Sequence, residues 1–196
     1  MRPNAIVRSL LAMSLLVVIA VPARAQGIKL EASLVHSTPG GDDFDGSKAG
    51  IGFDLAAVLS TPAKFSVAAG IQRTTHELEG SSDKIAALQF YAEPRMALGM
   101  LMGPVSPYLY VCASYVNNSG DIGAVEMKQK GFGFGGGLGI KASLPMSGLS
   151  WHASAGFHSI KLGDVENDGT TVPNSDASGT MMTLRAGVSF SFGPSM

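Results

Sequence analysis

Hydrophobic and polar residues alternate with a period of two in eight separate segments of this chain. In the clearest segment, every second residue from Met182 to Phe192 is hydrophobic, and the residues between them are mostly small or polar. Successive side chains of a β-strand point to opposite faces, so each segment predicts a strand with one hydrophobic and one polar face. The predicted strands cover residues 28–36, 49–59, 64–75, 85–95, 108–116, 131–144, 150–160 and 181–192.

The connections between these strands alternate in length and charge. Those at 60–63, 96–107 and 145–149 contain no acidic residue, whereas the other four are long and polar. Short turns at one end and long loops at the other are typical of outer-membrane barrels, whose short turns face the periplasm. The four long connections hold 12 of the 15 acidic residues, namely Asp42, Asp43, Asp45, Glu77, Glu79, Asp83, Asp121, Glu126, Asp164, Glu166, Asp168 and Asp176.

The polar face of the predicted strands is small and nearly uncharged. A water-soluble barrel would carry charged side chains on its outer face, but Gly, Ala, Ser and Tyr fill these positions here. The polar face is therefore expected to line a lumen and the hydrophobic face to contact lipid, which predicts an all-β fold, an eight-stranded antiparallel up-and-down transmembrane β-barrel. The expected lipid-facing aromatic residues are Phe53, Phe65, Phe90, Tyr115, Phe132, Trp151, Phe157, Phe190 and Phe192.

The first 25 residues have the pattern of a cleaved secretory signal peptide. Arg2 and Arg8 are followed by a hydrophobic run, and Ala23-Arg24-Ala25 fits a small-residue cleavage site. The run is shorter than the roughly 20 residues that a membrane-spanning helix needs. We expect export and a barrel domain over 26–196, and no lipid anchor is expected because the cleavage site is not followed by Cys.

Composition narrows the possible functions. Without the signal segment, 11 basic and 15 acidic residues remain, a net charge of −4, which disfavours nucleic-acid binding. The single cysteine, Cys112, cannot form an internal disulfide, so packing or a bilayer must stabilise the exported chain.

Two segments carry a resemblance to a known family. The glycine-aromatic run at 131–139 and the terminal strand at 184–192 are similar to those of the small eight-stranded outer-membrane barrels, which include the OmpA transmembrane domain, OmpX and the opacity-type surface proteins. The resemblance covers the whole exported chain and implies insertion by the barrel-assembly machinery. Family members usually end at the terminal aromatic residue, whereas four residues follow Phe192 here.

An eight-stranded barrel is just wide enough to be filled by side chains, so the lumen is expected to be closed. Charged groups inside it must pair and hydrogen-bond to be tolerated, and Tyr91, Tyr108 and Tyr110 would add bulk opposite the glycines of 131–139. A gated ion path is the alternative. The expected polar network of the lumen is Glu31, Asp54, Gln89, Glu93, Arg95, Lys141, His152 and Arg185.

Catalytic and metal-binding patterns are weak. His152, Ser154 and Glu166 have the order of an acyl-hydrolase triad and resemble the lipid A deacylases, but a strand of about ten residues separates the acid from the other two. Neither His158 with Ser159 nor the His76 region has the spacing of a closed metal site, and the acidic stretch at 42–47 lacks the glutamate that completes a calcium loop. No enzymatic activity, cofactor or metal is expected.

The sequence therefore predicts a structural or surface-interaction role in the bacterial outer membrane through four acidic outer loops. A narrow or gated porin-like pore is the first alternative, and a lipid A-modifying acyl hydrolase the second. The expected partners are outer-membrane lipid and lipopolysaccharide, the assembly machinery during insertion, and a host or environmental ligand at the outer loops.

Overall fold

The computed structural model describes residues 27–61, 64–99, 105–122, 125–146, 148–173 and 175–192. The predicted signal peptide and the four residues after Phe192 lie outside this part of the chain. The described residues form a short 3₁₀ helix and ten strands: β1 (Gly27–Gly40), η2 (Asp42–Phe44), β2 (Gly50–Ser60), β3 (Phe65–Glu77), β4 (Lys84–Ala97), β5 (Val105–Ile122), β6 (Val125–Ser143), β7 (Leu149–Leu162), β8 (Val165–Asn167), β9 (Thr170–Val172) and β10 (Ala177–Phe192).

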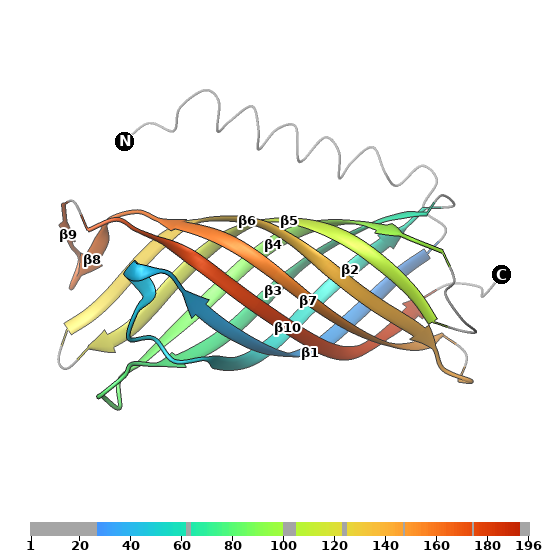
Figure 1. The fold of residues 1–196 in the computed structure, drawn as a ribbon, viewed down its shortest axis with the longest axis horizontal. Coiled ribbons are helices and arrows are strands. Elements are labelled where there is room, and N and C mark those ends of the chain that lie inside the picture. Colours follow the sequence, from blue (N-terminus) through green and yellow to red (C-terminus); the bar gives the residue numbers. More distant parts are fainter. Residues whose placement is uncertain are drawn as a thin grey trace, which may run out of the picture.

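Eight of these strands close into an antiparallel barrel (Figure 1). Each long strand pairs with the next one along the chain, and β10 pairs with both β7 and β1. The β1–β10 register runs from Ile28 opposite Phe192 to Gly40 opposite Thr180. The predicted up-and-down barrel is thus confirmed. Among the described residues, no helix is long and apolar enough to cross a membrane.

Along each barrel strand, residues that face the lumen are mostly buried, and the residues between them are mostly exposed on the outer face. On β1, Leu34 is 72% exposed on the outer face, whereas its neighbour Val35 is 1% exposed inside the lumen. Of the nine aromatic residues expected to face lipid, Trp151 is half-buried and the others are exposed. Tyr115 and Phe132 contact each other edge to face on neighbouring strands, as Phe190 and Phe192 do along β10 near the opposite end.

The glycines of β6 make room for tyrosines of β5. Gly139 lies opposite Tyr108 in the register, and a Cβ atom added at Gly139 would collide with the Tyr108 ring. Gly137 is opposite Tyr110 in the same way, and its added Cβ would lie 2.6 Å from the Tyr110 hydroxyl oxygen. The tyrosines therefore lean across their neighbouring strand and fill the lumen, rather than facing the glycines from the far wall.

The two ends of the barrel differ. One end carries η2, β8, β9 and the long connections, and we call it the loop end; the other, where β1 begins and β10 finishes, is the turn end (Figure 1). Longer connections at one end than at the other are typical of outer-membrane barrels.

Two connections that were predicted to be irregular loops contain paired strands in the structure. β5 and β6 remain paired as far as Ile122 opposite Val125, so Asp121 and Glu126 lie in a protruding hairpin rather than in a long loop. The last connection contains the β8–β9 hairpin, which attaches to β6. The tip of the β8–β9 hairpin is Asp168-Gly169, with φ angles of 46° and 80°. Tight two-residue hairpin turns of this kind require a positive φ at both central residues.

Candidate functional site

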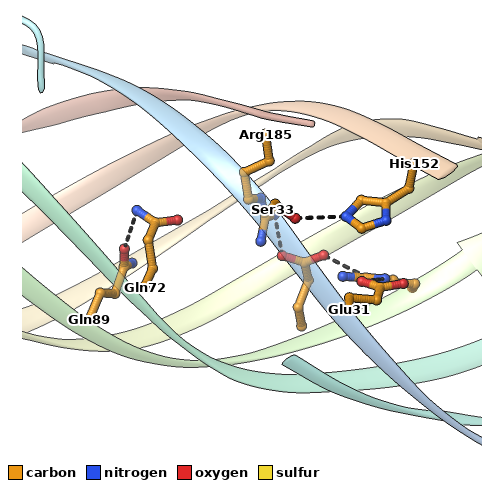
Figure 2. Close-up of polar contacts among 8 residues, drawn as sticks. Glu31, Ser33, Gln72, Gln89, His152 and Arg185 are labelled. Atoms are coloured by element: carbon orange, nitrogen blue, oxygen red, sulfur yellow. Dashed lines mark hydrogen bonds and ion pairs between the residues drawn. The ribbon is translucent and has the colours of Figure 1, made fainter. Parts of the chain in front are cut away.

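The middle of the lumen is crossed by a network of ion pairs (Figure 2). Arg95 on β4 contacts Glu31 on β1 through Nη1 and Oε2, and Glu93 through Nε and Oε1, both at 2.8 Å. Arg185 on β10 contacts the second oxygen of Glu93, with 2.5 Å between Nη2 and Oε2. Glu93 is fully buried and thus sits between two guanidinium groups. The network thus ties β4 to β1 and β10, which are neighbours in the barrel.

Tyrosine rings cover both guanidinium groups. Arg95 lies 5.2 Å from the centre of the Tyr108 ring, and Arg185 lies 5.5 Å from that of Tyr91 and 5.3 Å from that of Tyr110. A cation within about 6 Å of an aromatic face is attracted by the ring. The tyrosines therefore both fill the lumen and help to stabilise its buried cations.

The remaining residues of the expected network lie on the same inner face. His152 on β7 is hydrogen-bonded through Nε2 to the Ser33 hydroxyl at 2.8 Å, and Gln89 accepts a hydrogen bond from the Gln72 amide at 3.3 Å. Asp54 is buried on β2, and Lys141 is half-buried on β6 towards the turn end. The structure thus places all eight residues on the lumen side, with Glu31, Glu93, Arg95 and Arg185 in direct contact.

A second layer, which the sequence analysis did not identify, lies in the lumen nearer the loop end. It is hydrophobic and consists of Val116, Ile160, Leu162 and Met181, with Phe44 of η2 and Ala177 packed against it. The signal was present in the sequence, because Val116, Ile160 and Met181 interrupt the otherwise small and polar inner face of their strands.

The loop-end connections fold over this hydrophobic layer. The Asp43 carboxylate accepts a hydrogen bond from the Ser178 backbone N–H at 2.7 Å, which ties η2 to β10. His76 Nδ1 lies 3.0 Å from the Lys48 carbonyl oxygen, and the Gln129 amide donates to the carbonyl oxygens of Gly163 at 2.8 Å and Ser175 at 3.1 Å. These contacts leave a vestibule of about 310 Å³ at the mouth of the barrel.

The residues considered for acyl hydrolysis do not form a triad. His152 pairs in register with Lys141, whereas Glu166 on β8 pairs with Lys128. Because Lys128 and Lys141 are 13 residues apart on β6, roughly 40 Å of strand separates the histidine from the acid. Nor does any group of three or more His, Cys, Asp or Glu side chains suited to a metal ion occur in the part of the chain that the structure describes.

Comparison with known proteins agrees with this architecture. Residues 9–192 match the model of the family described as outer membrane protein beta-barrel domain. The chain belongs to this family. It is therefore a bacterial outer-membrane protein, with its exposed hydrophobic band in contact with lipid.

Solved structures show the same fold at low sequence identity. Neisserial surface protein A matches with a TM-score of 0.65 and 18% identity, over 84% of this chain and 97% of that protein. The outer membrane protein OprG from Pseudomonas aeruginosa matches with a TM-score of 0.56 and 11% identity, over 87% and 98%. A major outer membrane protein from Thermus thermophilus matches with a TM-score of 0.53 and 16% identity, over 84% and 99%. No curated protein matches the sequence.

Proposed function

We propose that this protein is a sealed barrel with a structural or surface-interaction role in the outer membrane, and that its acidic loop end is the interacting surface. The observation that carries the proposal is that buried side chains fill the lumen at two levels. The Glu31–Arg95–Glu93–Arg185 network crosses the lumen, and buried hydrophobic side chains around Met181 fill part of it nearer the loop end. An ion would have to break buried ion pairs and then pass the buried hydrophobic side chains around Met181, and both steps are costly.

Planar-bilayer recording of the refolded protein tests this proposal against a narrow or gated pore. We expect no steady single-channel steps from the wild type. Steady steps at moderate voltage would overturn the sealed lumen and favour the pore. The triple variant Glu93→Ala/Arg185→Ala/Met181→Ala serves as the positive control, because it removes side chains from both layers while leaving the outer face unchanged.

We further propose that the phosphate groups of lipopolysaccharide bind the outer face just beyond the hydrophobic band. Lys130 on β6 and Lys161 on β7 are exposed and point outward there, and Lys161 lies opposite Phe132 in the register. Like charges on neighbouring strands repel each other, so an anion between them would be favourable. Arg73 is a further outward-facing cation on β3, opposite Phe53 in the register.

Unfolding in urea from vesicles with and without lipopolysaccharide tests this contact. We expect lipopolysaccharide to raise the midpoint for the wild type and to raise it much less for Lys130→Gln/Lys161→Gln. The matched control is Lys48→Gln/Lys84→Gln, because both of these lysines already lie beside Glu77, at 4.0 Å and 3.4 Å. Equal stabilisation of all three proteins would argue against a specific phosphate contact.

A further inference from the structure

The vestibule at the loop end is a built cavity with contributions from all four long connections. Its volume of about 310 Å³ lies at the lower end of the range of small-molecule sites, which is about 300–1,000 Å³. A molecule with a single ring is therefore the appropriate size. The hydrophobic part of its wall consists of Phe44, Leu78, Ile85, Met127, Val165 and Met181.

The floor and the wall of the vestibule are fixed by the rest of the fold. Met181 is 8% exposed and belongs to the hydrophobic layer of the lumen, so this layer forms the floor of the cavity. Asp43 and Gln129 use hydrogen bonds to hold η2 and the last connection in place. A cavity held in this way needs little ordering when a ligand enters, which favours binding.

Polar groups of the vestibule occur at two levels. Asn118 on β5 lies opposite Ala87, at the depth of the floor, and its carboxamide oxygen is buried without a hydrogen-bond partner among the described residues. Asp43 and Asp45 belong to the connection above, and both are exposed. His76 and Gln129 also line the cavity, and both are already hydrogen-bonded to backbone carbonyl oxygens. The site thus presents a buried acceptor at the bottom, mainly hydrophobic walls, and negative charge at the rim.

We propose that the vestibule binds a small organic cation with a single ring, an ammonium group at one end and a hydrogen-bond donor at the other. The ring contacts Met181, Ile85 and Phe44, whose hydrophobic surfaces leave water on binding. The ammonium group stays at the rim beside Asp43 and Asp45, where the acidic loop end attracts cations. The donor at the other end reaches the Asn118 oxygen and satisfies it.

Tyramine, the 4-hydroxyphenethylammonium ion, is a probe that carries all three features. Two analogues each lack one of them: phenethylamine has no hydroxyl group, and 4-ethylphenol has no ammonium group. We expect calorimetric titration of the refolded exported chain in detergent micelles to show saturable one-to-one binding of tyramine. Binding of either analogue should be weaker by about tenfold, which corresponds to one hydrogen bond or one charge contact.

Three variants locate the site. Ala87→Phe fills the vestibule and should abolish tyramine binding, whereas Ala86→Phe adds the same bulk to the outer face of the same strand and should leave it unchanged. Asn118→Leu should weaken tyramine binding by about tenfold but leave phenethylamine binding unaltered, because only tyramine donates a hydrogen bond there. Heat-modifiable gel migration verifies that each variant forms the barrel.

The absence of saturable tyramine binding to the wild type would overturn the proposal, and so would equal binding by Ala87→Phe. An Asn118→Leu variant that loses both ligands equally would overturn the role of its oxygen. The test is separate from those of the sealed lumen and of the lipopolysaccharide contact, since bilayer conductance and urea midpoints are measured without tyramine.

Discussion

Arg185 and Glu93 form an ion pair across the full width of the barrel. Their strands, β10 and β4, are four positions apart in a ring of eight, and yet Nη2 and Oε2 lie 2.5 Å apart. The two side chains together therefore span the lumen. Because Glu93 also contacts Arg95, the opposite walls of the barrel are connected by one carboxylate with two cationic partners.

Replacing Glu93 with Ala should destabilise the barrel by about 3–5 kcal/mol, since it leaves Arg95 and Arg185 as buried charges without their shared partner. Urea unfolding from phospholipid vesicles measures the effect. Glu79→Ala is the matched control, because it removes an exposed acid from a loop-end connection and should change the stability by less than about 0.5 kcal/mol. If the two variants were equally stable, the network would contribute nothing to the fold.

Gly139→Ala should destabilise the barrel by about 1–3 kcal/mol, because the new methyl group overlaps the Tyr108 ring. The double variant Gly139→Ala/Tyr108→Ala should remove that specific penalty, so that the effects of the two changes are not additive in a double-mutant cycle. Gly163→Ala is the control, since its added Cβ would meet only the Lys130 carbonyl oxygen at 3.5 Å. Additive effects of the two changes would mean that the ring does not require a glycine there.

An arginine placed on the outer face tests the position of the bilayer. Leu55 lies in the middle of the outward-facing hydrophobic positions of β2 and is 50% exposed. Leu55→Arg should cost about 2–4 kcal/mol in vesicles, the value for a charge at the bilayer midplane, whereas Thr75→Arg near the loop end should cost about 0–1 kcal/mol. Equal costs at the two positions would contradict the placement of the hydrophobic band.

Cys112 gives a chemical test of the closed lumen. It is 2% exposed and packs with Tyr91, Tyr108 and Tyr110 on the inner face. A membrane-impermeant maleimide should label it in the folded barrel at least roughly 100-fold more slowly than after unfolding in urea, because the reagent must reach a thiol that the fold covers. Ser178→Cys in a Cys112→Ser background places the thiol at an exposed position and should react quickly. Rapid labelling of folded wild type would show that the lumen is accessible to water.

The parts of the fold inside the bilayer could be predicted from the sequence because lipid and lumen impose opposite requirements on alternate residues. On β1, for example, the polar Ser33 is 6% exposed on the lumen side, whereas the hydrophobic Leu34 is 72% exposed on the outer face. Beyond the band that constraint disappears. The hairpin at Asp121 and Glu126 has no lipid-facing side, so its residues do not alternate and were predicted as a loop. The dipeptide Asp168-Gly169, which favours a two-residue hairpin turn, could have indicated the β8–β9 hairpin.

The composition of the lumen was predictable, but its pairing was not. Alternation places Glu93 and Arg185 on the inner face, whereas their contact joins residues 92 positions apart and depends on how far the strands are staggered around the barrel. The vestibule was also not predictable, because its wall combines residues from four connections whose positions are fixed by contacts such as that of Asp43 with Ser178.

The pairing of β1 with β10 has a consequence for how the molecule is made. Ile28 and Phe192 lie opposite each other, so the two strands that complete the ring are the first and the last of the barrel in chain order. The ring cannot close until β10 has been delivered across the inner membrane, and contacts between such distant segments form slowly. Arg185 arrives with the final strand, and Glu93 gains its second cation only then. Closure of the ring and the pairing of Glu93 with Arg185 are therefore a single event. A chain truncated before β10 would leave the Glu93 carboxylate with one cationic partner, exposed to lipid, instead of forming a smaller barrel.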